Sequence, residues 1–463
     1  MEDLTFEKLE KMIFDLCCEM ARKITLEFLK NQDEKLMNDR DKNRYRFKDI
    51  KKSTIKTLYG DVVFGRRYYK DNTTGKMVFL LDEKLHMDVV GTFSVNVVKM
   101  VLEACRSMSF QAASDFITQH TGLNISKSGS WNIVQEIGNN IEEYEKMLAD
   151  GKQKINKDKK TAKVVFEEAD GIWLHQQLPN KKKGKSMELK LCTIYDGWSS
   201  NNRQKLVGKK VLGGMCTAKN FKKKINAVMD SIYYIDEIEN IIINGDGADW
   251  IEQTLDYNAI YQLDRFHVKK AIRTNIKNRT VRKDVNHAFE ERNTERLLEL
   301  IEMYADSLEG IDDKEVKKAR ALYRYLNRGD AIYSYSERGI KIPDPPEGIV
   351  YKTGGVQENQ NCTLATGRMK GHRRRWSKNG ANNMIKILCS FENDDIDDFI
   401  TLPEMEAVGS IDPDEICSAG SIKKTVGFGN RYLEIYSSAV PVLNNINNML
   451  TVSLRALNNN IAI

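Results

Sequence analysis

The chain has 463 residues, of which 41% are hydrophobic and 30% charged; this excludes a disordered protein and provides material for two or three domain cores. Its net charge of +6 is mild for that length, so the distribution of charge is more informative than its total. No apolar run approaches the roughly 20 residues of a bilayer span, the N-terminus has no cleavable signal pattern, and the eight cysteines form no Cys-x-x-Cys pair, which together predict a cytoplasmic protein with reduced thiols and no membrane partner.

Residues 1–155 are expected to form a mainly helical, DNA-binding N-terminal region. Apolar residues at helical spacing predict a helix up to about Lys35, and β-forming residues around a Tyr-Gly-Asp turn predict a hairpin after it. Residues 109–137 predict two short helices around a turn at Gly122, which together make a helix-turn-helix. The alternative is a helical hairpin that only packs, because such hairpins have the same pattern.

Residues 156–280 are predicted to begin an α/β catalytic domain. Strand signals at 164–169, in MELKLCTIYDGW and in KKVLGGMCT are followed by an amphipathic helix, the buried strand NIIIN, and a short strand that runs into another helix. Three consecutive strands followed by βα units predict a mixed sheet with helices on both faces. This is the element order of the ribonuclease-H-like fold, in which the first and fourth strands are neighbours.

Two aspartates stand where predicted strands end, Asp170 after 164–169 and Asp246 after NIIIN. On neighbouring strands they would lie side by side, and at about 4 Å two carboxylates repel each other by about 4 kcal/mol at an effective dielectric near 20. A divalent cation would remove that cost, or one aspartate would hold a proton. Oxygen ligands favour Mg²⁺ or Mn²⁺, and two such ions promote displacement at a phosphodiester. For Gly-Asp-Gly alone, an ordinary turn is the alternative.

Three ranges complete the predicted organisation. Residues 281–348 are expected to form an all-helical insertion with a loop, residues 349–395 the last part of the catalytic domain, and residues 396–463 a C-terminal tail region.

A two-metal site usually has a third carboxylate, and Glu358 is the leading choice because it follows a Gly pair and precedes a segment that could begin a helix. Glu337 and Glu347 are competitors.

Asp264 and His267 lie three residues apart in LDRFH, on one helical face if the helix has already begun. A hydrogen-bonded pair there would support the metal aspartates or contact a phosphate. The alternative is a helix cap by Asp264 beside a packed histidine.

Four basic runs predict a polyanionic partner, although each alone could be a solvated face. Arginines bind phosphates, and a tryptophan face can stack on a flipped or terminal base, whereas a buried structural tryptophan is the alternative. The residues expected to contact DNA are Lys222, Lys223, Arg368, Lys370, Arg373, Arg374, Arg375 and Trp376.

The segments EADGIWLHQQ, NGDGADWI, LDRFHVKKAI and RMKGHRRRWSKNGANNM occur in that order. They resemble the ISLre-type family of bacterial insertion-sequence transposases, long described as an uncharacterised protein family, and are similar to the wider Mutator-type group. The resemblance covers most of the chain. It implies a ribonuclease-H-like domain that carries an Asp-Asp-Glu triad, with a helical insertion before the glutamate. It also implies a Cys-or-Asp-x-x-His motif, which Asp264 and His267 match.

The resemblance implies that Asp170, Asp246 and Glu358 are the catalytic, metal-binding acids. The implied reaction is metal-dependent cleavage at the ends of the element, followed by transfer of 3′-hydroxyl ends into target DNA. The implied partners are double-stranded DNA, as terminal inverted repeats and target, and further copies of the chain in a homodimer or higher oligomer, which would associate with the nucleoid when bound. The alternatives are a ribonuclease-H-like nuclease without strand transfer and a non-catalytic DNA-binding protein derived from a transposase.

Overall fold

The computed structural model describes residues 5–85, 87, 90–152, 159–201, 205–252, 255–256, 258–371 and 373–400, so most of the predicted tail region lies outside the described residues. The chain divides into a first unit, Met1–Val101 with Ser109–Ser130 and Ile400–Ile463, and a second unit, Leu102–Met108 with Trp131–Phe399. Within the described ranges, no helix has both the length and the apolarity that crossing a membrane requires. The cysteines of these ranges are free thiols.

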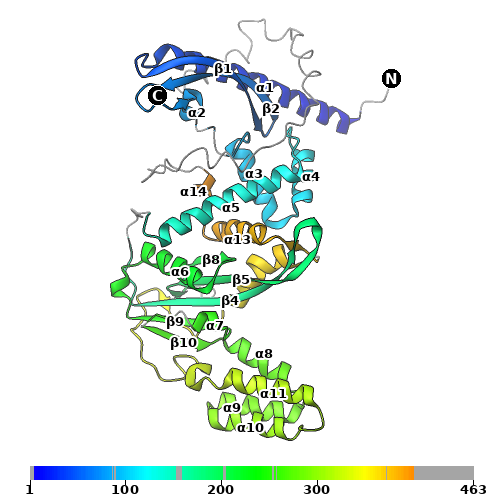
Figure 1. Cartoon of the computed structure of the whole chain (residues 1–463), viewed down its shortest axis with the longest axis vertical. Coiled ribbons are helices and arrows are strands. Elements are labelled where there is room, and N and C mark those ends of the chain that lie inside the picture. The colour runs from blue at the N-terminus through cyan, green and yellow to red at the C-terminus, as the bar shows by residue number, and fades with distance from the viewer. Residues whose placement is uncertain are drawn as a thin grey trace. The chain divides into compact units, whose positions relative to one another are not determined.

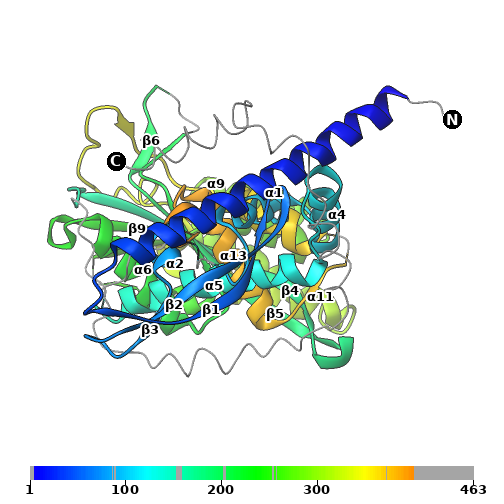
Figure 2. The ribbon, with the colours of Figure 1, turned by 90° about the horizontal axis from the view of Figure 1, so that it is seen from above.

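The first unit contains the predicted long helix and hairpin, and both are confirmed. The elements are α1 (Phe6–Asp39), β1 (Tyr45–Thr57), β2 (Gly60–Asp71), β3 (Met77–Val78) and α2 (Leu80–Leu85). Figure 2 shows α1 lying across β1 and β2, and a small apolar core that includes Leu29, Val62 and Phe64 joins the helix to the hairpin. The turn ends at Gly60, whose φ of +111° requires glycine.

The predicted pair of helices around Gly122 is also confirmed, but the second helix is longer than expected. The helices of this part are α3 (Val95–Ser107), α4 (Phe110–His120) and α5 (Lys127–Ala149). Ser109 caps α4, and Ser126 Oγ accepts a hydrogen bond of 3.1 Å from Gly129 N at the start of α5. The hydroxyls of Ser114 and Ser130 lie 2.9 Å apart and link the two helices. DNA binding by this pair stays a prediction.

The second unit is built around a mixed sheet. Its strands are β4 (Val164–Gln177), β5 (Lys183–Tyr195), β8 (Lys210–Gly214), β9 (Asn240–Gly245) and β10 (Ala259–Leu263), in the order β10-β9-β4-β5-β8. The pairs β4–β9 and β9–β10 are parallel, whereas β5 is antiparallel to both of its neighbours. The first and fourth of these strands along the chain are therefore neighbours, as predicted.

One expectation about this sheet was wrong, because β4 does not end before Asp170. The strand continues to Gln177, since β5 pairs with it well beyond Asp170 and β12 (Arg375–Trp376) pairs with its last part. It is β9 that ends beside Asp170.

Helices cover both faces of the sheet. On one face, Cys192 and Ile194 of β5 share a core with Phe221 and Ile225 of α6 (Ala218–Ile232). On the other face, α13 (Lys378–Glu392) approaches so closely that a Cβ on Gly213 would lie 2.5 Å from Ile385. A continuous run of apolar residues such as NIIIN is the pattern that burial on both faces produces.

The helices predicted between residues 281 and 327 are present and extend the core beyond the β10 edge of the sheet (Figure 1). They are α9 (Arg279–Glu290), α10 (Thr294–Asp306) and α11 (Asp313–Leu326), preceded by α7 (Asp249–Glu252) and α8 (Arg265–Asn275). The other elements are β6 (Gly197–Ser199), β7 (Leu206–Val207), β11 (Ile349–Val350), α12 (Gln357–Gln360), the π-helix η4 (Asn361–Lys370), α14 (Ile396–Ile400), and the 3₁₀ turns η1 (Pro179–Lys181), η2 (Ile235–Glu237) and η3 (Gly329–Ile332).

A buried ion network joins three helices of this unit. Lys386 on α13 and Lys224 on α6, both buried, face Glu142 and Glu145 on α5, with Lys224 Nζ 2.7 Å from Glu142 Oε2. Burial acts to raise the pKa of Glu142, but Lys386 and Lys224 outweigh it and lower that pKa to about 2. Removing one partner from such a network leaves buried charge without compensation, which is strongly destabilising.

Candidate metal centre

Strand register brings Asp170 and Asp246 together. Ala169 of β4 is in register with Gly245, the last residue of β9, and an aspartate comes directly after each of them in the sequence. Because the two strands are parallel, Asp170 and Asp246 are neighbours across the sheet at the point where β9 ends. Strand register therefore sets Asp246 next to Asp170, but among the described residues the group whose candidate ligand atoms all lie within 4.8 Å of one another does not include Asp246.

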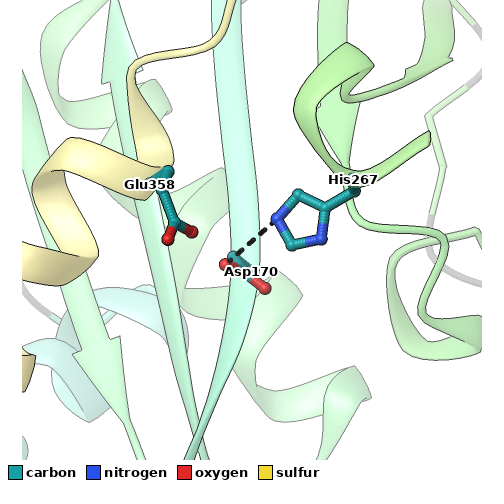
Figure 3. A group of neighbouring side chains, drawn as sticks. All are labelled: Asp170, His267 and Glu358. Carbon is teal, nitrogen blue, oxygen red and sulfur yellow. Dashed lines mark ion pairs between the residues drawn. The ribbon is translucent and has the colours of Figure 1, made fainter. Parts of the chain in front are cut away.

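Asp170 also lies beside two side chains from distant parts of the chain. Candidate ligand atoms of Asp170, His267 and Glu358 all lie within 4.8 Å of one another (Figure 3). His267 Nε2, from the first turn of α8, is 3.8 Å from Asp170 Oδ2. Asp170 is buried, His267 half-buried and Glu358 exposed.

Asp170 is a buried carboxyl group beside a second one, that of Asp246. Burial and the charge of Asp246 raise the pKa of Asp170 to about 7, although hydrogen bonds from Gly171 N (2.7 Å) and Asn361 Nδ2 oppose the shift. A cation between the carboxylates would stabilise the charged form and lower that pKa.

The side chains present fit a divalent cation. Two carboxylates and an imidazole, with Asp246 adjacent, are a donor set that suits Mg²⁺ or, with the nitrogen ligand, Mn²⁺. A cation about 2.1 Å from each ligand atom keeps opposite ligand atoms about 4.2 Å apart. Of three ligand atoms around one octahedral ion, at most one pair is opposite, and adjacent ligand atoms lie about 3.0 Å apart. The present spacing of up to 4.8 Å therefore needs a contraction of up to about 2 Å, which side-chain rotation supplies.

The end of the helical insertion fixes the loop that carries Asp246. Tyr325 Oη donates to Asp246 O at 2.8 Å, and Arg328 donates to Gly247 O at 3.0 Å. Gly247 has a φ of +89°, and a Cβ there would lie 2.6 Å from the Tyr325 ring, so only glycine fits. Asp246 Oδ1 accepts from Ala248 N at 2.9 Å, so its own loop holds one oxygen of the carboxylate.

Asp264 caps α8, which is the alternative that the sequence had left open. Its Oδ1 accepts from Phe266 N at 2.7 Å and its Oδ2 from Asn244 Nδ2 at 2.9 Å. The side chain is buried. Asp264 therefore acts on the cluster by fixing the first turn of α8, which presents His267 to Asp170.

The two competitors of Glu358 lie elsewhere. Glu337 accepts hydrogen bonds from Ser334 N (2.9 Å) and Ser334 Oγ (2.8 Å) and pairs with Arg265. Glu347 is exposed in the loop before β11. Among the described residues, the group around Asp170 contains Glu358 and neither of these.

Three of the residues expected to contact DNA are buried, which corrects that expectation. Lys222 Nζ lies 2.9 Å from Glu167 Oε2 and 3.0 Å from Asp256 Oδ2 inside the second unit. Its charge is satisfied within the protein and is not presented to a phosphate.

Arg368 and Trp376 are the other two. Arg368 Nε donates to Cys105 O at 2.7 Å, its guanidinium lies 5.2 Å from the centre of the Trp376 ring, and burial lowers the pKa of Arg368 to about 10. Trp376 Nε1 donates to Met369 O at 2.8 Å. The buried structural tryptophan, the alternative stated above, is the arrangement present.

The other basic residues stay candidates for DNA contact. Arg374 is half-buried and donates to Gly367 O at 3.2 Å. Those with exposed side chains are Lys223, Lys370, Arg373 and Arg375.

The sequence reasoning missed two residues beside the cluster. Asn361 donates to Asp170 Oδ2, and Glu168, on the same face of β4 as Asp170, is fully buried against the start of α12. The alternation of a strand places residues 168 and 170 on one face, which was the signal available in the sequence.

Comparisons with known proteins match nearly the whole chain. A family model described as "Uncharacterised protein family (UPF0236)" matches residues 1–397. The "UPF0236 protein in vanSb 3'region" of Streptococcus gallolyticus is 26% identical over 399 residues, covering 83% of this chain and 83% of that protein. A UPF0236 protein of Caldanaerobacter subterraneus subsp. tengcongensis is 24% identical over 405 residues, covering 85% of this chain and 76% of that protein.

Two solved structures also align with part of the chain. The Mos1 strand transfer complex is 10% identical, covers 52% of this chain and 78% of that chain, and gives a TM-score of 0.14. A pre-cleavage Mos1 transpososome is 9% identical and gives a TM-score of 0.15. Scores this low carry no information about the fold or the function of this chain.

Proposed function

We propose that this chain, which belongs to the uncharacterised protein family UPF0236, is the DNA transposase of an insertion sequence. It would cleave DNA at the ends of the element and transfer the 3′-hydroxyl ends into target DNA. The observation that carries the proposal is the meeting of Asp170 with Glu358 and His267, at the level where strand register also sets Asp246.

The topology of the sheet supports a ribonuclease-H-like assignment for the second unit. Numbered along the chain, the strands have the order five, four, one, two, three, and the second is antiparallel to its neighbours. In that order, acids at the first strand and just after the fourth would lie side by side, and the third acid would come from a helix that packs on the same face.

The side chains of the cluster have separate roles in this proposal. Asp170, Asp246 and Glu358 would hold divalent cations, whose charge activates the attacking oxygen and stabilises the leaving oxygen of a phosphodiester. His267, beside Asp170, would either be the nitrogen ligand of a cation or donate a hydrogen bond to a phosphate oxygen. Of the three side chains grouped around Asp170, Glu358 is the exposed one, so a DNA strand would approach the cluster from its side.

Both reaction steps are phosphoryl transfers. In the first, the oxygen of water bonds to phosphorus at the element end, and the bond to the 3′-oxygen breaks to release a 3′-hydroxyl. In the second, that 3′-oxygen bonds to a phosphorus of the target, and the target's own 3′-oxygen leaves with a proton. The same residues serve both steps, because each step displaces one oxygen by another.

The names of three relatives from one Caldanaerobacter strain join eleven, four and two designations. A sequence that recurs within one strain is what copies of a mobile element produce, so these names support the proposal. The proposed partners are double-stranded DNA, as inverted repeats and target, and a second copy of the chain that pairs the two ends.

The test uses the full chain with DNA duplexes taken from the ends of its own element. We expect Mg²⁺- or Mn²⁺-dependent cleavage and joining to a plasmid target, and Asp246→Asn should reduce cleavage to background while DNA binding stays within twofold. Asp249→Asn, an exposed aspartate three residues further on, is the matched control and should retain activity.

The other outcomes separate the alternatives. Cleavage without joining would identify a nuclease, and specific binding without cleavage by the wild-type chain would identify a non-catalytic DNA-binding protein. Full activity in the Asp246→Asn variant would remove that carboxylate from the reaction.

A further inference from the structure

Glu168 is a buried carboxylate surrounded by hydrogen-bond donors. It lies on β4 two residues before Asp170 and is 1% exposed. Its Oε1 accepts from Tyr195 Oη at 2.5 Å, and its Oε2 accepts from Asn244 Nδ2 at 3.2 Å and from three backbone N–H groups at 3.0–3.1 Å. Because carboxyl oxygens accept and these five groups all donate, hydrogen bonds hold both oxygens of Glu168 in place.

The three backbone donors belong to the turn that presents the third acid. They are the N–H groups of Gly355, Val356 and Gln357, and Glu358 is the next residue, at the start of α12. Bonds from three consecutive N–H groups to one oxygen fix both the position and the direction of this turn. Gly354 fits closely in the same place, since a Cβ there would lie 3.3 Å from Glu168 Oε1.

A second set of contacts ties α12 to the same strands. Gln357 Oε1 accepts from Thr193 Oγ1 at 2.9 Å, and Gln357 Nε2 donates to Asn361 Oδ1 at 3.0 Å. Asn361 then donates to Asp170 Oδ2. The segment that carries Glu358 is therefore attached to β4 at both Glu168 and Asp170.

We propose that Glu168 is a positioning residue, whose carboxylate holds the turn at 355–357 and thereby sets Glu358 beside Asp170 to share a divalent cation. This inference rests on the proposed function, because it assigns the residue that orders the third metal-binding acid. Glu168 itself is enclosed by the protein and does not reach the cation. It acts through the backbone, as outer residues that orient metal ligands do.

The test is a double-mutant cycle on Mn²⁺ affinity, measured by calorimetry on the full chain without DNA. Glu168→Gln keeps the shape of the side chain but presents an amide group to the donors, and should weaken Mn²⁺ binding about 10- to 100-fold. Combined with Glu358→Gln, it should cause no further loss, because the ligand that it positions is already gone. A further loss in the double variant equal to that of Glu168→Gln alone would overturn the proposal.

One control variant and one replacement variant accompany the double-mutant cycle. Glu167→Gln changes the neighbouring buried carboxylate, which faces Lys222. It should lower the stability that circular dichroism measures but leave Mn²⁺ affinity within about twofold. If Glu168→Gln does not fold, Tyr195→Phe replaces it in the cycle, because it removes the hydroxyl that donates to Glu168 Oε1. Tyr195→Phe should weaken Mn²⁺ binding several-fold, and this loss should disappear in the Glu358→Gln background.

The failure of this inference is distinct from the failure of the proposed function. A wild-type chain that binds Mn²⁺ and cleaves element ends, with a folded Glu168→Gln variant of equal affinity, refutes the positioning role alone. A wild-type chain that neither binds Mn²⁺ nor cleaves DNA refutes both.

Discussion

Replacing Asp170 by asparagine should stabilise the metal-free protein at neutral and alkaline pH while abolishing its response to divalent cations. Burial and Asp246 raise the pKa of Asp170 from 3.8 to about 7. Between about pH 4 and pH 7, Asp170 therefore holds a proton in the folded state that it has already released in the unfolded chain. The free energy of unfolding must fall as pH rises across this interval and level off above about 7.

The magnitude follows from the same two values. A pKa difference of about 3 corresponds to about 4 kcal/mol, and this is an upper figure because water entry and side-chain rotation relieve part of the repulsion. Asp170→Asn removes the titrating charge. It should therefore be the more stable protein at pH 8 by up to about 4 kcal/mol, with the difference disappearing towards pH 4.

Urea unfolding, followed by circular dichroism from pH 4 to 8 with a chelator present, measures this difference. Mn²⁺ should then raise the stability of the wild type at pH 8 and leave the variant nearly unchanged, because ligand binding to the folded state stabilises it. A stability difference that does not depend on pH, or an equal response of both proteins to Mn²⁺, would refute the account of Asp170.

Three further predictions concern residues away from the cluster. Lys386→Met should lower the free energy of unfolding by about 3–5 kcal/mol, because the change leaves buried carboxylates short of a partner; a loss below about 1 kcal/mol in urea unfolding would contradict the buried network. Replacing Arg373 and Arg375 together by alanine should reduce the dependence of log affinity on log salt concentration by about 2, as fluorescence anisotropy with duplex DNA would show. Arg368→Met should instead lower stability and leave that slope unchanged, and an equal change in slope would restore Arg368 as a DNA contact.

Patterns of apolar residues within short segments of the sequence predicted several helices and strands. The apolar run before Asp246 identified β9, and helical periodicity identified α6 and the helices after residue 279. The order of those elements then identified which strands are neighbours. The end of β4 could not be found in this way, because the strand continues past Asp170 only through its pairing with β5 and β12.

The errors and omissions share a physical cause, which is that their partners are distant along the chain. Lys222 lies in a basic run, but Glu167 and Asp256 enclose its charge. Glu168 reads as one acid among several, and its backbone donors lie 187 to 189 residues further on. Spacing within one sequence reports which residues share a face, and it does not report what packs against that face.

The central claim is that Asp170, Asp246 and Glu358 bind the same divalent metal site, and anomalous diffraction from crystals grown with MnCl₂ tests it most directly. The account predicts a manganese peak within coordinating distance of all three carboxylates, about 2.1–2.2 Å from their nearest oxygens. A manganese peak that involves none of them, or a fully ordered cluster without manganese in the presence of DNA, would contradict it.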